Sequence, residues 1–124
     1  MQLTEHRNEK QLFVRRADAR SVTVIDRVHQ HSLALSATRL IDAFAPRTVA
    51  ELGPEAISQV LSLQPEVVLL GTGDQITFPP PSVLAQFLTR GIGLETMDNA
   101  AAARTFNVLI GEGRAAAVVF LLPG

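Results

Sequence analysis

The spacing of apolar residues changes along the chain, and the change separates two kinds of predicted structure. In the first third, apolar and polar residues tend to alternate, as they do over 21–25. Alternation is typical of strands with one buried face, so we expect strands over 11–16, 21–25 and 28–36 joined into an antiparallel meander. After Gly53, apolar runs and helical spacings take turns, which predicts β-α-β-α-β order from residue 66 onward.

The clearest strand is the run Val67–Leu70. Consecutive branched apolar residues fit a strand that is buried on both faces, as in a parallel sheet. The Gly71-Thr72-Gly73 that follows permits a sharp turn, and glycine leaves room for another group to approach closely. Because open α/β sheets bind ligands beyond the carboxyl ends of their strands, this end of the strand is the first candidate for a binding crevice.

Proline and aspartate positions mark the starts of the remaining helices, since both are favoured in the first turn or at the N-cap. The predicted elements are a short strand and a loop within 37–52, a helix over 54–63, a helix after Pro81 that buries Val83, Leu84, Phe87 and Leu88, a buried strand over 92–96, a helix over 99–110 capped by Asp98, and a strand over 115–122. Helical crossovers between the last three strands predict that these strands are parallel.

Composition narrows the classes of function. The 124 residues carry a formal net charge of -1 and no cysteine, so the sequence offers neither a basic surface for nucleic acid nor thiolate ligands for a metal. The N-terminal residues 1–10 are polar and lack periodicity, so we expect a flexible tail followed by one α/β domain over 11–124. With no apolar run long enough to cross a membrane and no signal-peptide pattern, we expect a soluble, cytoplasmic protein.

Six residues form the candidate crevice. They are Gly71, Thr72, Gly73, Asp98, Arg104 and Asn107. The last helix carries a polar patch among small and apolar neighbours, formed by Arg104, Thr105 and Asn107. With Thr72 this patch could line a crevice. The alternatives stay open: Asp98 as a simple helix cap, Arg104 in solvent, and Asn107 paired with nearby backbone groups.

Established catalytic patterns are absent from the sequence. Gly71–Gly73 lacks both the third glycine of a dinucleotide fingerprint and the Lys-Ser/Thr of a phosphate loop. No serine lies in a Gly-x-Ser-x-Gly elbow. His29 and His31 share one face of a strand but have no evident third ligand. We therefore expect no catalytic residues, no metal and no cofactor.

Three blocks of sequence resemble a known family. Residues 65–73, 78–81 and 91–109 occur in the order and spacing of domain-of-unknown-function family 498, and the resemblance extends from about Leu12 to Leu122. It implies a three-layer α/β sandwich with a mixed sheet and an N-terminal β portion. Family members often have Thr and Tyr at the positions of Asn99 and Phe106. The phenol hydroxyl is missing here, which argues against Phe106 as part of a catalytic group.

The resemblance also implies a kind of function. The family includes a mitochondrial assembly factor of respiratory complex I, and it has no established catalytic activity. We therefore expect an uncharacterised, non-enzymatic interaction or assembly-factor-like domain with protein partners, no bound nucleic acid, and peripheral association with a membrane complex or homodimerisation as options. The alternative is a small-molecule-binding protein or enzyme that uses the crevice.

Overall fold

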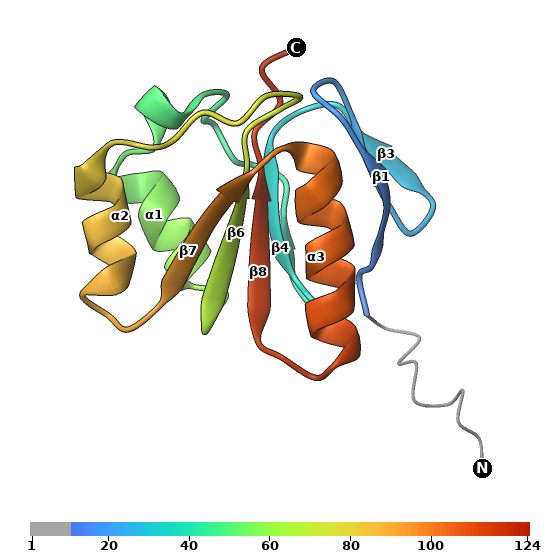
Figure 1. Cartoon of the computed structure of the whole chain (residues 1–124). Coiled ribbons are helices and arrows are strands. Elements are labelled where there is room, and N and C mark those ends of the chain that lie inside the picture. Colours follow the sequence, from blue (N-terminus) through green and yellow to red (C-terminus); the bar gives the residue numbers. More distant parts are fainter. Residues whose placement is uncertain (1–10) are drawn as a thin grey trace.

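A mixed five-stranded sheet runs through the part of the chain that the computed structural model describes, residues 11–124 (Figure 1). Its strands lie in the order β5-β4-β8-β6-β7. They are β4 (Leu33–Ser36), β5 (Leu40–Ile41), β6 (Val67–Gly71), β7 (Gly93–Met97) and β8 (Ala116–Phe120). β6 pairs in parallel with both β7 and β8, as predicted, whereas β4 is antiparallel to β8.

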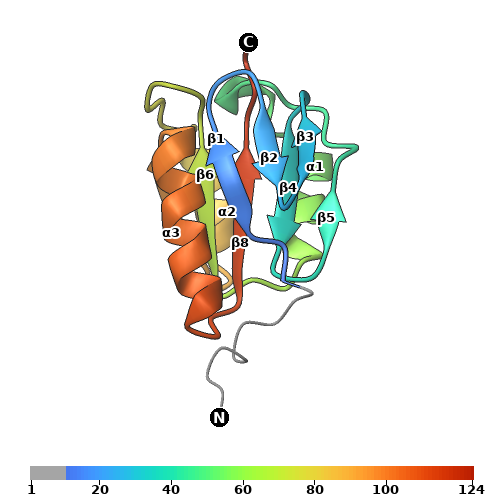
Figure 2. The same ribbon diagram turned by 90° about the vertical axis from the view of Figure 1, so that its right-hand side faces the viewer.

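A second, three-stranded sheet covers part of one face (Figure 2). It is the predicted meander, with β1 (Val14–Ala17), β2 (Val22–Val24) and β3 (Arg27–His29) all antiparallel. The single strand expected over 28–36 is wrong, because β3 ends at His29 and β4 belongs to the large sheet. Leu33, Ala34 and Leu35 are all fully buried, so this segment needs cover on both faces. Leu33 and Leu35 pack with the small sheet, and Ala34 packs in the apolar cluster on the opposite face.

Helices complete the layers on both faces. α1 (Pro54–Leu61) and α2 (Pro81–Leu88) pack on one face, while α3 (Asn99–Gly111) lies beside the small sheet on the other face (Figure 1). The segment 37–52 contains β5 and a single turn of 3-10 helix, η2 (Val49–Glu51), which agrees with the expected short strand and loop. The predicted α/β three-layer fold with a mixed sheet is confirmed. The predicted tail, residues 1–10, lies outside the described residues.

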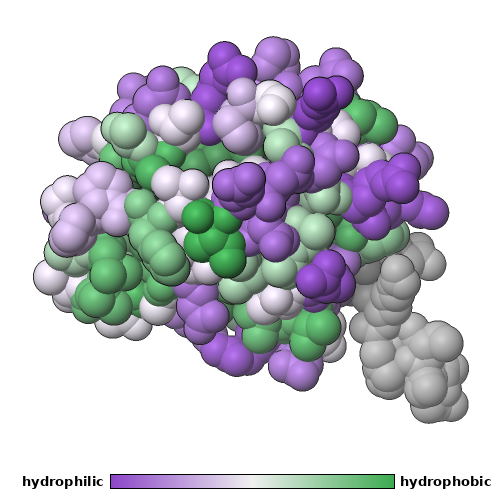
Figure 3. Space-filling view, turned by 45° about the horizontal axis from the view of Figure 1, so that its top comes forward, coloured by the Kyte–Doolittle hydropathy of each residue, from purple (hydrophilic) through white to green (hydrophobic). Residues whose placement is uncertain are grey.

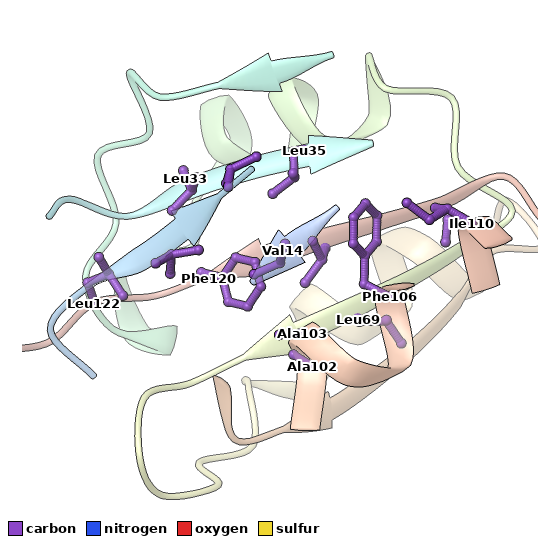
Figure 4. Packing of buried hydrophobic residues seen from close by; sticks show 14 residues of the cluster. Val14, Leu33, Leu35, Leu69, Ala102, Ala103, Phe106, Ile110, Phe120 and Leu122 are labelled. Atoms are coloured by element: carbon purple, nitrogen blue, oxygen red, sulfur yellow. The ribbon is translucent and has the colours of Figure 1, made fainter. Parts of the chain in front are cut away.

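The core is divided by the large sheet into two apolar clusters. All five residues of β8 are buried, and their side chains alternate between the two clusters. Val118 and Phe120 pack with Phe106 of α3 and with the small sheet (Figure 4), whereas Ala117 and Val119 face α1 and α2. β8 is therefore the central strand, and β6 is interior but one position away from the centre.

Two predictions of burial are wrong on the β7 side of the sheet. β7 is an edge strand whose residues are only half-buried or exposed, because no further strand covers its outer side. Along α2, Val83 and Phe87 point into the core, but Leu84 and Leu88 are 36% and 56% exposed. A helix that packs through one stripe buries positions four apart and turns the adjacent pair about 100° away.

Candidate functional site

Asn99 organises the carboxyl edge of the large sheet where β6 ends. This residue opens α3 directly after Asp98 and is fully buried. Its side-chain Oδ1 accepts a hydrogen bond from the Gly73 N–H at 3.1 Å. Its Nδ2 donates to the backbone carbonyls of Asp18 at 2.8 Å and Leu121 at 3.0 Å. One amide therefore joins four separate segments of chain.

Gly71 and Gly73 both make room for this arrangement. A Cβ atom at Gly71 would overlap Oδ1 of Asn99, so glycine is required for the amide to fit. Gly73 has a φ of 100°, and a Cβ there would lie 3.0 Å from the ring of Pro123. The close approach that the sequence predicted at these glycines thus occurs, and the group that approaches Gly71 is a side chain of the protein itself.

Thr72 holds the loop that follows. Only 8% of its surface is exposed. Its hydroxyl donates a hydrogen bond to the Gln75 carbonyl at 2.6 Å and accepts one from the Thr77 N–H at 3.0 Å. Both hydrogen-bonding directions of the hydroxyl are in use. Thr72 therefore shapes the loop between β6 and α2.

The turn between β1 and β2 is fixed against the same edge. Asp74 accepts a hydrogen bond from the Ala19 N–H at 3.0 Å. Asp18 accepts from the N–H groups of Arg20 and Ser21 at 2.8 and 2.9 Å. These backbone hydrogen bonds, that from Arg20 first, hold the pKa of Asp18 below its ordinary value. The result is a fixed turn that places Arg20 at the surface.

The remaining three candidate residues spread along α3. The Asp98 side chain caps the helix by accepting from the Ala101 N–H at 2.8 Å, as predicted. Arg104 and Asn107 lie roughly 8 and 12 Å beyond Asn99 along the axis at the usual rise per residue. Arg104 is exposed. Asn107 pairs with β1, accepting from the Val14 N–H at 2.9 Å and donating to its carbonyl at 2.7 Å.

The structure thus brings Gly71, Thr72, Gly73 and Asp98 to one edge and leaves Arg104 and Asn107 further along α3. Ligand binding by the six residues stays a prediction. Asn99 escaped the sequence reasoning, which treated Asp98 as the polar feature of this helix start. Its signal was an amide-bearing residue immediately after a good N-cap, in a helix of small residues.

An apolar surface is formed by α2 and the loop that precedes it. It consists of Ile76, Phe78, Leu84 and Leu88, which are 52%, 75%, 36% and 56% exposed. We call these four residues the α2 surface, since they belong to α2 and the loop before it. Figure 3 shows apolar residues gathered over the side of the molecule that carries α2. Exposed apolar side chains that gather into one patch are typical of contact surfaces.

Comparison with known proteins identifies the family. A family model described as "Protein of unknown function (DUF498/DUF598)" matches residues 14–121. The chain belongs to this family. The resemblance seen in the sequence is therefore confirmed over most of the chain.

Three similar proteins add detail. A Xanthomonas campestris protein solved by NMR is 42% identical with a TM-score of 0.85, and the match covers 100% of this chain and 94% of that one. The Bos taurus protein named NADH dehydrogenase [ubiquinone] 1 alpha subcomplex assembly factor 3 is 36% identical over 75 residues, which are 59% of this chain and 41% of the relative. A Francisella tularensis protein named 13 kDa major membrane protein is 27% identical over 69% of this chain and 71% of its own length.

The other expectations concern the partner, a membrane span, metal binding and the location of the protein. The match with this chain covers less than half the length of the bovine assembly factor. The complex in that protein's name is therefore a property of the relative and is not assigned to this chain. Among the helices of residues 11–124, none has the length and apolar character needed to cross a bilayer. Within the same residues, no three His, Asp or Glu side chains are grouped as metal ligands would be. The cytoplasmic location stays a prediction.

Proposed function

We propose that this protein is a non-enzymatic interaction domain of the assembly-factor kind, which binds a protein partner through the α2 surface. The observation that carries the proposal is the exposure of four large apolar side chains on one segment, next to the uncovered edge of β7. Relatives named as assembly factors support a protein as the partner. The hydrogen bonds at the end of β6 agree with this, since the side chains of Thr72 and Asn99 are engaged by backbone groups of the chain itself.

The apolar character of the α2 surface defines the partner's contact surface. None of its four residues is charged, so the partner must present apolar side chains that would be costly to leave in water. Phe78 is the best anchor, because aromatic residues contribute most to protein interfaces. β7 is an edge strand of the large sheet, and the N–H and C=O groups on its outer side could pair with a strand of the partner.

The test is quantitative affinity capture of the full chain from cells that carry it at native abundance. Phe78→Ser and Leu88→Ser should each lower recovery of the specific partner by about tenfold or more if they are central contacts. Val108→Ser is the matched control, because Val108 on α3 is 58% exposed, close to the 56% of Leu88. That variant should retain the partner.

Three results would contradict the proposal. The first is a wild-type capture without a specific partner, and the second is a partner that survives both substitutions on the α2 surface. The third is recovery of the chain itself alone, with a dimer in sedimentation that the two substitutions abolish. That result would replace the foreign partner with a second copy of this protein.

A further inference from the structure

A cavity of about 720 Å³ opens at the carboxyl edge of the large sheet, beyond β8 and the start of β4. Four separate segments surround it: the β1–β2 turn, the β3–β4 connection, the residues after β5, and the residues after β8. These segments meet near the C-terminus at the top of Figure 2. The cavity is distinct from the α2 surface and shares no residue with the six-residue candidate crevice.

The floor of the cavity is apolar with one hydroxyl. Ala19, Phe44 and Leu122 contribute buried side chains. Ser32 is 2% exposed, and its Oγ accepts a hydrogen bond from the Leu122 N–H at 2.9 Å. The hydrogen bonds of residues 11–124 give the Ser32 hydroxyl proton no acceptor. A donor at the bottom of an apolar hollow can serve a bound acceptor.

The rim carries two arginine side chains and one carboxylate side chain. Arg20 and Arg47 are permanent cations, and the lining also includes the carboxylate of Asp42. The ion pair found within residues 11–124 joins Arg114 and Glu66 at another place, so neither rim arginine forms an ion pair with a side chain of the described residues. The Arg47 guanidinium donates one hydrogen bond to the Pro123 carbonyl at 2.9 Å. Its other N–H donors are available to a ligand.

Hydrogen bonds hold the rim arginines in place. The Arg20 N–H is fixed by Asp18, whose carbonyl is bound in turn by buried Asn99. The Arg47 N–H donates to a Glu51 carboxylate oxygen at 2.7 Å. The backbone of both arginines is therefore set before any ligand arrives, which reduces the ordering cost of binding.

We propose that this cavity binds a small organic carboxylate with an apolar, preferably aromatic, body. The guanidinium groups of Arg20 and Arg47 take the carboxylate, because the planar fork of arginine matches two carboxylate oxygens. The body of the ligand lies against Phe44 and Leu122, and the Ser32 hydroxyl donates to an acceptor on it. This site is independent of the protein-partner surface, so either proposal can fail alone.

The first test is a titration of the full chain, labelled with 15N, with sodium benzoate as the probe. Saturable amide shifts should concentrate in the four segments that surround the cavity. Benzamide, which has the same ring without the charge, should bind about tenfold or more weakly, since a charge-assisted hydrogen bond is lost. Benzoate shifts that do not saturate, shifts elsewhere, or equal affinity for benzamide would overturn the proposal.

The second test uses charge variants. Arg20→Gln and Arg47→Gln should each weaken benzoate binding by about tenfold, whereas Asp42→Asn should strengthen it by about twofold to fourfold by removing repulsion. The gain in Asp42→Asn cannot come from damage to the fold.

Arg39→Gln is the matched control. Arg39 is exposed and donates one hydrogen bond to the Ser62 carbonyl at 2.8 Å, as Arg47 does to Pro123, but it lies at the opposite end of β4. The Arg39→Gln variant should bind benzoate with the same affinity as the wild type. Unchanged affinity in both rim arginine variants, or no gain in Asp42→Asn, would refute the assignment.

Discussion

Two places along the carboxyl edge of the same sheet carry polar side chains. At one place these side chains bond to the protein itself, and at the other they stand at an open cavity. Beyond β6, the Asn99 amide and the Thr72 hydroxyl are buried, and their hydrogen bonds all go to the chain itself. Beyond β8, Arg20 and Arg47 stand at the rim of an open cavity without an ionic partner.

The difference follows from what covers each place. The first lies under α3 and the β1–β2 turn, where an unpaired polar group would be costly. The second lies between loops, where water can satisfy charge. A polar cluster at the end of a strand therefore indicates a ligand site only when its hydrogen bonds are not already used.

Removal of the Asn99 side chain should break the comparison most strongly. Asn99→Ala loses three hydrogen bonds and leaves buried backbone groups unpaired, so we expect the free energy of unfolding to fall by about 2–4 kcal/mol. Urea denaturation measures this. A loss of less than about 0.5 kcal/mol, the range of ordinary surface substitutions, would show that the amide does not hold the edge together.

Gly71→Ala should have the next largest effect. The added methyl group would overlap Oδ1 of Asn99, and overpacking of this kind costs about 1–3 kcal/mol. The double variant with Asn99→Ala should lose less than the sum of the two single losses, because the clashing atom is gone. Full additivity in the same denaturation experiment would rule out the Gly71–Asn99 contact as the cause.

Arg47→Gln should change stability little, which is the contrast with Asn99. Its guanidinium is exposed and makes one hydrogen bond to the backbone, so we expect a change within about 0.5 kcal/mol. The same variant should nevertheless weaken benzoate binding. A large loss of stability without a loss of binding would reverse the assignment of the two places.

The smallest expected effect is a pH dependence of the free energy of unfolding that arises from His29. Burial, and then the charge of Arg27, lower the pKa of His29 below 6.5, while Asp42 raises it. In the window just below 6.5 the unfolded chain binds more protons at this residue, so the free energy of unfolding should rise with pH there.

Asp42→Asn should lower the pKa of His29 further and thereby steepen that rise. His29→Gln should remove the contribution altogether. NMR titration of the His29 ring, alongside denaturation on both sides of the window, would check both statements. A rise in the pKa of His29 in Asp42→Asn would contradict the assigned influence of the carboxylate.

Much of the fold could be predicted because it depends on local patterns. The run Val67–Leu70 indicated a buried strand, Pro54 and Asp98 marked helix starts, and each of these was confirmed. The segment 28–36 was misread as one strand, since alternation does not tell which sheet a residue joins. The turn at Ile25 has a φ of 56°, a conformation that a branched residue rarely adopts without support from packing. Ile25 packs against the core of the small sheet.

The candidate site could be predicted only in part. The glycines at the end of β6 predicted that another group approaches the backbone closely. The sequence alone allowed this prediction, because glycine has no side chain to block such an approach. The identity of the approaching group depended on α3 returning to the same edge, which brought Asn99 against Gly71 across an interval of 28 positions in the chain.

The sequence by itself determined the order of strands and helices after Gly53, the strand at β8 and the cap at Asp98, since these arise from neighbours in the chain. Only the tertiary structure decided which polar groups are paired and which are open. Asn99 and Arg47 are both polar residues in the sequence, but one meets Gly73, Asp18 and Leu121 inside the protein and the other faces a cavity. Pairing depends on segments that are distant in sequence and adjacent in space, and no local pattern encodes that adjacency.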